Sequence, residues 1–334
     1  MKKLTKILTA TALSATILGA SVGVMTSCSQ KPIIGVIQFG THASLNNCYE
    51  GIKLGLQEAG IDVEKDYKIE FVNDNFDADA STSHATALVN KGAKVIIGIA
   101  TPSAMAAANK ADGNIPVVYC AVTDGSNLDN YENVCGSSDR PNYEVTLDMV
   151  TKVMGKEDLK IGVLSYSGED SDPIMISDMR AAAQTYNGME IDVKTVTEIT
   201  TVTTSAQALV SDNVDCVVNL LDNTIVGQLD NLFPVFNEAN IPVFGSEVEQ
   251  AVGTGYKNGA CVAAASIDYI EVGKISGKMA GQILKGEKTA EQLGQQLVQE
   301  PTLYYNPTQF ERFNLTKPES LTMISTADYV AAKS

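Results

Sequence analysis

Two groups of polar side chains in this sequence have the chemistry to hold a small zwitterion. Thr101 and Ser103 stand where a helix begins after an apolar strand, and hydroxyls beside free backbone N–H groups favour a carboxylate or another anion. Asp222 and Glu247 follow later apolar runs, and their carboxylates suit an ammonium group. Together these residues predict recognition of an amino acid by its two charged ends.

Polar loops follow seven of the expected strands. A polar residue after a strand is also an ordinary helix cap. Ligands of open parallel sheets, however, bind beyond the carboxyl ends of the strands, so seven polar loops at one end favour a binding site. The expected contacts are Gln38, Ser44, Thr101, Ser103, Thr123, Asp124, Ser167, Asp222, Asn223 and Glu247, with the ligand's side chain beside Phe39, Tyr119 or Tyr166.

The two histidines and the acidic clusters have less specific interpretations. His42 either contacts the ligand or caps the helix that starts at Ser44, and His84 is expected on the surface of an amphipathic helix. The acidic clusters lack the ligand spacing and the central glycine of a calcium loop. We expect them to be solvated helix entries: Glu169, Asp170 and Asp172, and Asp74, Asp77 and Asp79.

Motifs of catalysis are absent from the sequence. Beyond the apolar leader of residues 1–27 it contains no G-x-S-x-G elbow, and the whole chain contains no G-x-x-x-x-G-K-[ST] loop, no C-x-x-C pair and no motif that pairs a nucleophile with either histidine. The run GTGYKNG lies between a helix and a strand, the wrong order for a dinucleotide turn. We therefore expect no enzyme activity, no metal and no cofactor, and an α/β enzyme is the weaker alternative.

Apolar runs of strand length alternate with amphipathic stretches along most of the chain, the rhythm of a parallel sheet covered by helices on both faces. The expected strands are Ile33 to Phe39, Lys68 to Val72, Val95 to Ile99, Pro116 to Cys120, Leu159 to Leu164, Glu190 to Val196, Cys216 to Leu220, Pro242 to Gly245 and Cys261 to Ala265. The expected helices are Ser44 to Ala59, Ala78 to Asn90, one from Pro102, Asn142 to Met154, Ile174 to Tyr186, Ser205 to Ser211, Thr224 to Asn240 and Tyr269 to Lys285.

This order predicts two doubly wound, Rossmann-like α/β lobes in tandem, joined by a hinge. We expect one lobe to contain residues 31–139 and 267–299, and the other residues 140–266 and 300–334. The chain would cross between them near 139–141, 266–268 and 299–302. A ligand that contacts both lobes would then favour their closed arrangement.

The N-terminus predicts export and lipid anchoring. Lysines precede an uncharged apolar run in residues 1–27, which is typical of a signal peptide, and Ser27-Cys28 resembles a lipobox whose cysteine takes a lipid. A plain cleaved signal is the alternative. Residues 28–32 would form a lipidated linker at the outer face of the cell membrane.

Charge and cysteine content limit the partners and the covalent structure. The full chain has a formal net charge of −16, and the leader contains lysines but no acid, so nucleic acid is not an expected partner. Five cysteines remain after Cys28, an odd number, and three of them sit in apolar strand-like runs. We expect no disulfide framework.

Several long segments resemble one known family. IGVIQFGTHASLNNCYEGIKLGLQEAG, VIIGIATPSAMAAAN, IPVVYCAVTD, KIGVLSYSGEDSD, LLDNTIVGQLDNLFPVFNEANIPVFGSE and DYIEVGKISGKMAGQILKGEK are similar, in this order, to substrate-binding lipoproteins of ABC transporters that bind tryptophan or phenylalanine. The resemblance implies a type I periplasmic-binding-protein fold, an aromatic amino acid as the favoured ligand, and ABC permease and ATPase subunits as partners. By motif it supports Ala100 to Ser103, Thr123, Asp124, Asp222, Asn223 and Glu247 as contacts. A sensory binding protein that reports to a receptor is the alternative.

Overall fold

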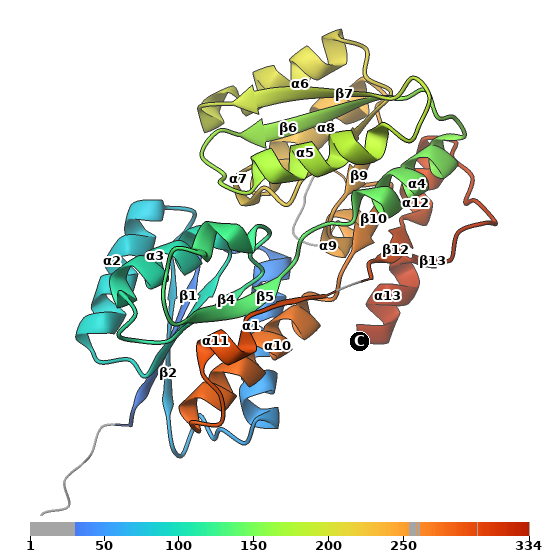
Figure 1. Ribbon diagram of the computed structural model, residues 1–334. Helices are drawn as coiled ribbons and strands as arrows, with labels where there is room; N and C mark the ends of the chain where they lie inside the picture. Colours follow the sequence, from blue (N-terminus) through green and yellow to red (C-terminus); the bar gives the residue numbers. More distant parts are fainter. Residues whose placement is uncertain (1–30, 254–258, 260, 299, 334) are drawn as a thin grey trace, which may run out of the picture. The chain divides into compact units, whose positions relative to one another are not determined.

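The first of two sheets is parallel throughout and has the strand order β11-β5-β4-β3-β1-β2. Figure 1 labels its strands β1, β2, β4 and β5. The computed structural model describes residues 31–253, 259, 261–298 and 300–333. The predicted signal peptide and Cys28 lie outside these described residues. The strands of the first sheet are β1 (Ile33–Gln38), β2 (Lys68–Asn73), β3 (Val95–Ile99), β4 (Val117–Cys120), β5 (Val134–Ser138) and β11 (Gln295–Leu297).

Helices cover both faces of this sheet because both faces are apolar. On β1, Ile34 and Val36 join the core cluster that contains Ile52, whereas Ile37 points to the other face and packs in the cluster that contains Leu88. The elements around the sheet are α1 (Ala43–Glu58), α2 (Ala78–Asn90), α3 (Thr101–Ala111), the short 3-10 helix η1 (Gly125–Leu128), α10 (Tyr269–Leu284) and α11 (Ala290–Leu293).

Helices α1 and α10 touch backbone to backbone at glycines. A Cβ atom on Gly51 of α1 would lie 2.1 Å from the carbonyl oxygen of Ile270, and one on Gly273 of α10 would lie 2.1 Å from the carbonyl oxygen of Cys48. Such separations are far inside van der Waals contact, so only glycine permits this approach. The contact joins a segment near residue 270 to the N-terminal part of the chain.

The second sheet has the strand order β13-β12-β10-β9-β8-β6-β7 and is parallel except for the antiparallel pair of β10 and β12. Its strands are β6 (Lys160–Tyr166), β7 (Glu190–Val196), β8 (Cys216–Val218), β9 (Val243–Gly245), β10 (Ala263–Ser266), β12 (Thr302–Tyr305) and β13 (Met323–Ser325). Its helical elements are α4 (Tyr143–Met154), α5 (Asp172–Ala183), η2 (Ile199–Thr201), α6 (Val202–Ser211), α7 (Asn223–Val226), α8 (Leu229–Glu238), α9 (Val248–Val252), α12 (Pro307–Arg312) and α13 (Thr326–Lys333).

The predicted doubly wound α/β organisation is confirmed, with differences in particular elements. The single helix expected from Thr224 to Asn240 is wrong: the chain forms α7, turns at Gly227 and Gln228, and restarts as α8, and the poor helix propensity of glycine accounts for the break. Strand β5 was not predicted because its second half is Gly136-Ser137-Ser138, which carries little apolar signal. The strands and helices beyond residue 286 were not predicted either.

Three connections carry the chain between the two sheets. They run from β5 to α4, from β10 to α10 and from β11 to β12, and the last includes residue 299, which is outside the described residues. All five described cysteines are free and buried: Cys48, Cys120, Cys135, Cys216 and Cys261. Burial was expected for Cys120, Cys216 and Cys261, which lie in apolar runs.

Candidate functional site

Loops at the carboxyl ends of strands from both sheets meet at one cavity. The space free of protein atoms there is about 340 Å³, part of it continuous with solvent. Its lining includes residues from each of the segments that follow β1, β3, β4, β5, β6, β8 and β9. The polar lining consists of His42, Thr101, Thr123, Asp139 and Tyr269 from the first sheet's segments and Glu169, Asn223 and Glu247 from the second's.

Two predicted hydroxyl residues of the first sheet line this cavity. Thr101 is the first residue of α3 and is 3% exposed, and its hydroxyl lies 3.1 Å from the hydroxyl of Ser171, which precedes α5 of the other sheet. The hydroxyl of Thr123 donates a 2.9 Å hydrogen bond to Oδ1 of Asp139. The start of α3 therefore offers a hydroxyl and the positive end of a helix dipole to the cavity.

Two predicted residues of the second sheet also line the cavity. The side-chain oxygen of Asn223, the first residue of α7, lies 3.1 Å from Nε2 of His42. Glu247 precedes α9 and is 4% exposed, and its Oε2 accepts a 2.8 Å hydrogen bond from the amide of Gln250. An amide and a carboxylate thus face the cavity from this side.

Six predicted residues are not among those that line this cavity. For two of them, Ser103 and Ser44, hydrogen bonds within the protein show where the side chain points instead. Ser103 lies two residues after Thr101 on α3, about 200° around the helix, so it points inward and donates to Oδ2 of Asp74 at 2.6 Å. The hydroxyl of Ser44 donates to Oε2 of Glu249 at 3.3 Å. Both side chains have protein partners in the interior.

Three more predicted residues satisfy nearby groups or face solvent. The side-chain amide of Gln38 donates to the carbonyl oxygen of Gly40 at 2.7 Å. Asp124 caps η1 by accepting from the backbone N–H of Ser126 at 3.1 Å. Ser167 is exposed at the end of β6.

Asp222 is a helix cap. It is fully buried, and its Oδ1 accepts 2.9 Å hydrogen bonds from the backbone N–H groups of Thr224 and Ile225. Its Oδ2 accepts a 2.7 Å hydrogen bond from the backbone N–H of Tyr166. Three backbone donors therefore occupy the carboxylate that was expected to face an ammonium group across from Glu247.

Sequence reasoning missed two carboxylates of the cavity. Asp139 was treated as part of a chain crossing, and Glu169 was expected to be solvated, which is wrong: Glu169 is 5% exposed. The chain turns tightly at this point, with a 3.0 Å hydrogen bond from the N–H of Glu169 to the carbonyl of Tyr166, and the glutamate lies inside. Asp172, from the same cluster, is likewise buried at 2% exposure. Asp139 and Glu169 each follow a strand, and this position was the sequence signal that could have identified them as cavity residues.

The two histidines differ from their expected environments. His42 precedes α1 but makes no side-chain cap, and its ring lines the cavity. His84 is only partly exposed, and its Nδ1 lies 2.6 Å from Oδ1 of Asp74, which is 1% exposed rather than solvated. Asp77 is the member of that cluster that does cap a helix, by accepting from the N–H groups that begin α2. His84 is therefore a structural partner of a buried acid.

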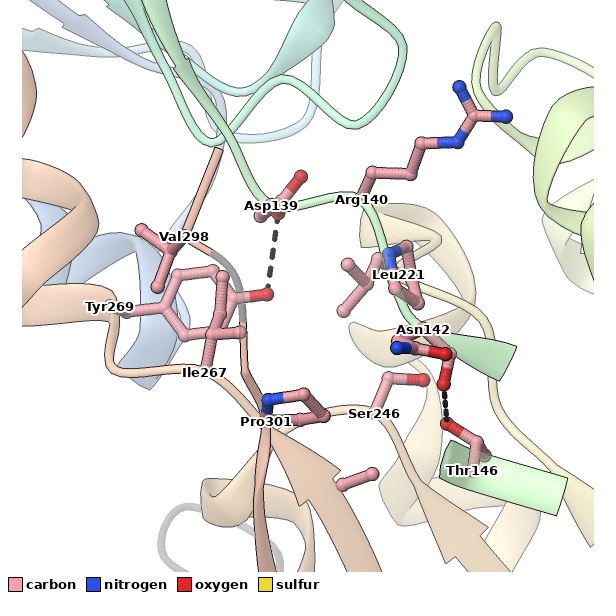
Figure 2. A pocket seen from close by; sticks show the side chains of 12 residues that line it. Asp139, Arg140, Asn142, Thr146, Leu221, Ser246, Ile267, Tyr269, Val298 and Pro301 are labelled. Carbon is pink, nitrogen blue, oxygen red and sulfur yellow. Dashed lines mark hydrogen bonds between the residues drawn. The ribbon is translucent and has the colours of Figure 1, made fainter. Parts of the chain in front are cut away.

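A second cavity adjoins the first at the connections between the sheets. Figure 2 shows the hydroxyl of Tyr269 pointing to Asp139, and this hydrogen bond is 3.3 Å long. The lining includes Arg140, Ile267 and Pro301, one residue from each of the three connections. Asp139 and Tyr269 line both cavities, so the candidate site borders directly on the connecting segments.

Residues 33–329 match the family model of ABC transporter substrate binding proteins. The chain belongs to this family. The resemblance deduced from its sequence segments is thereby confirmed, and so is the type I periplasmic-binding-protein fold.

Two similar proteins are known with an amino acid as their ligand. A tyrosine-binding protein of Clostridioides difficile (strain R20291) is 30% identical over 273 residues, which are 80% of this chain and 76% of that protein. The crystal structure of an ABC domain in complex with L-Trp from Streptococcus pneumoniae has a TM-score of 0.79 and 28% identity, and the match covers 87% of this chain and 97% of that one. A conserved domain protein from Vibrio cholerae shares the fold with a TM-score of 0.79 at 24% identity, over 89% of this chain and 100% of that one.

The family and its solved neighbours are solute-binding proteins rather than enzymes. Over the ranges that the structure describes, none of the helices combines the length and the apolar composition that crossing a bilayer requires. Within the same ranges, no group of three or more His, Cys, Asp or Glu side chains is placed to hold a metal ion.

Burial changes the acidity of the cavity carboxylates in this substrate-binding protein. Burial raises the pKa of Asp139 to about 6, against the opposing effect of the hydrogen bond from Thr123. Burial, together with the nearby negative charge of Asp222, raises the pKa of Glu169 to about 8. The cavity therefore disfavours additional negative charge on its walls and favours a cationic group within it.

Proposed function

We propose that this protein is the extracytoplasmic, lipid-anchored substrate-binding component of an ABC importer and that it captures an amino acid, with an aromatic one favoured. Family membership supports the transporter role, and the tyrosine- and L-Trp-binding relatives support the ligand class. Cys28 would take the lipid and hold the protein at the outer face of the cell membrane. The partners would be ABC permease and ATPase subunits.

The observation that carries this proposal is the chemical composition of the cavity. Thr101 at the start of α3 offers a hydroxyl and a helix N-terminus to a ligand carboxylate, while the acidic side chains Glu169 and Glu247 face the same space. One cavity thus holds complementary groups for both charged ends of an amino acid. Phe39 and Tyr166 line an adjoining groove that also contains Glu169, and their rings would pack against an aromatic side chain.

The mechanism that we propose is closure of two lobes around the ligand. The lobes are residues 31–139 with 267–299 and residues 140–266 with 300–334, and each contains one of the two sheets. The contacts of Thr101 with Ser171 and of His42 with Asn223 join segments that follow strands of different sheets. A ligand that adds contacts to both sides favours the closed arrangement, which the permease would recognise.

A binding screen tests this function. Residues 29–334 are purified and their melting temperature is measured against the twenty amino acids, nucleosides and small sugars, because a ligand that binds only the folded state raises that temperature. We expect a rise with tyrosine, tryptophan or phenylalanine, confirmed by calorimetry. A response confined to nucleosides or sugars would reject the amino acid and leave the solute-binding role.

The anchor and the transport role have their own tests. We expect Cys28→Ser to abolish incorporation of labelled palmitate and to release the protein from the membrane fraction. We also expect deletion of the gene to reduce uptake of the bound amino acid by cells. Normal uptake, together with loss of a transcriptional or motility response to that amino acid, would instead establish a sensory role.

A further inference from the structure

Glu169 is the cavity carboxylate that has the most negative surroundings. It lies in the turn between β6 and α5 and is 5% exposed. Asp222, at the start of α7, and Asp172, in the first turn of α5, are buried beside it. Burial raises the pKa of all three carboxyl groups, and ionised neighbours would repel one another there. Asp170 adds a further negative charge from an exposed position. A nearby cation would strongly stabilise the ionised form of a glutamate in this position.

Little in the cavity supplies that cation. Its described lining contains no Lys or Arg, and the histidine that faces it, His42, already lies against the side-chain oxygen of Asn223. Asn223 provides hydrogen bonds to Glu169, but these are neutral donors. The positive charge that would balance Glu169 is therefore missing from the walls described for this cavity.

The other two carboxylates of the cavity have better partners. Asp139 accepts from the hydroxyl of Thr123 on one oxygen and from the hydroxyl of Tyr269 on the other. Glu247 accepts from the amide of Gln250. Asp139 and Glu247 do not each have two buried acids beside them, as Glu169 does. A ligand cation is therefore stabilised most strongly beside Glu169.

We propose that Glu169 receives the ligand's ammonium group and releases its own proton to solvent as the ligand binds. The inference rests on the proposed function, since it assumes that the ligand is an amino acid or another amine. It makes Glu169 a specificity-determining residue: a ligand without a positive charge would leave the buried acids unbalanced.

The direction of the pH effect follows from the charges around Glu169. Its carboxyl faces Asp170 and Asp172 of its own segment, Asp222 at α7, His42 before α1, Asp139 after β5 and Glu247 before α9. Burial, followed by the negative charges of Asp222 and Asp170, raises its pKa to about 8, so the free protein holds a proton there at neutral pH. An ammonium group favours the ionised form, so binding expels the proton and affinity rises with pH until about pH 8. Below pH 8 the affinity rises by nearly tenfold per pH unit. Because the neighbouring acids titrate together, the released proton comes from the acidic cluster as a whole.

Calorimetry with three related compounds tests the proposal. L-tyrosine carries both charged groups, tyramine lacks the carboxylate and 3-(4-hydroxyphenyl)propanoate lacks the ammonium. Each is titrated into residues 29–334 at pH 6, 7 and 8, in two buffers of different ionisation enthalpy, so that proton release is measured directly. We expect close to one proton released per tyrosine at pH 7, about tenfold tighter binding at pH 7 than at pH 6, and no binding of the propanoate.

Glu169→Gln and Asp170→Asn form the matched pair of variants. The first keeps the shape of the buried side chain and removes its titration, and the second removes an exposed acid one residue away. We expect Glu169→Gln to weaken tyrosine binding at least tenfold at pH 8, to approach wild type at pH 6 and to release almost no proton. Because Asp170 contributes less to the raised pKa of Glu169 than burial and Asp222 do, Asp170→Asn should keep the proton release and should move the pH dependence only slightly towards lower pH.

The possible failures are distinguishable. Equal binding of the propanoate and tyrosine, or unchanged proton release in Glu169→Gln, overturns the role of Glu169 and leaves amino-acid binding intact. Binding of tyramine without binding of any amino acid rejects the proposed ligand class and supports Glu169 as a cation site. If neither amino acids nor amines bind, both proposals are wrong.

Discussion

The carboxylate of Glu249 on α9 accepts a 2.7 Å hydrogen bond from the side-chain amide of Asn47 on α1. These helices belong to different sheets, and the hydroxyls of Ser44 and Tyr329 also donate to the same carboxylate. Glu249 is 7% exposed, so the loss of a donor leaves a buried charge less well satisfied.

Asn47→Ala is therefore expected to weaken ligand binding without removing a residue of the cavity lining. A hydrogen bond to a charged group contributes about 1.5–3 kcal/mol. The bond between Asn47 and Glu249 exists only when α1 and α9 are in contact, so the variant destabilises this closed arrangement and not the open one. We expect affinity to fall by about ten- to a hundredfold in calorimetry, mainly through faster dissociation. The control is Asn90→Ala, at an exposed position of α2. Unchanged dissociation in Asn47→Ala would show that this contact does not stabilise the bound state.

Gly51→Ala should destabilise the folded protein. The added methyl group would lie 2.1 Å from the carbonyl oxygen of Ile270, so α1 and α10 would have to separate. We expect the free energy of unfolding in urea to fall by about 1–3 kcal/mol or more. Gly227→Ala is the matched control, because its Cβ would meet its nearest atoms at 3.4 Å, an ordinary contact. Similar losses in both variants would refute the close-packing explanation.

Asp139 should make the stability of the ligand-free protein depend on pH. In the folded state its pKa is raised to about 6 by burial, whereas the unfolded chain ionises near pH 4. Between these values the folded state binds more protons, so the free energy of unfolding falls as pH rises through this window and the full loss is present above pH 6.

Asp139→Asn removes that contribution. We expect the stability of the variant relative to wild type to increase by about 2–3 kcal/mol between pH 4 and pH 7, measured by urea unfolding at each pH. Titration of every other acid is common to both proteins and cancels in the comparison. A difference that stays constant with pH would mean that Asp139 has no raised pKa in the folded protein.

His84→Ala is expected to lower stability and to leave ligand affinity unchanged. Its ring is one of three donors to the buried carboxylate of Asp74, beside the hydroxyls of Ser81 and Ser103. Loss of one donor to a buried acid costs about 1–3 kcal/mol in urea unfolding. Thr86→Ala, at an exposed position of the same helix, is the control and should change little. A large loss of affinity in His84→Ala would place the ligand near α2 rather than in the cavity.

Much of the architecture was predictable from local sequence. Each buried strand such as Val95–Ile99 is a short apolar run, and each covering helix such as Ala78–Asn90 is a longer amphipathic one, so both element types follow from composition and period. At the break between α7 and α8, Gly227 was a local signal that the prediction did not use, whereas the strand Val134–Ser138 was not predictable in this way. Neighbouring strands decide whether a weakly apolar segment pairs, and those neighbours are distant in sequence.

The sequence by itself determined which loops end at the same edge of each sheet, because the carboxyl ends of parallel strands must lie together. Only the tertiary structure decided which side chain of each loop enters the cavity. Thr101 lines it while Ser103, two residues later, points to Asp74, since successive residues of a helix are turned by about 100°. Asp222 caps α7, whereas the turn after β6 buries Glu169. These outcomes depend on packing between segments, which no local pattern contains.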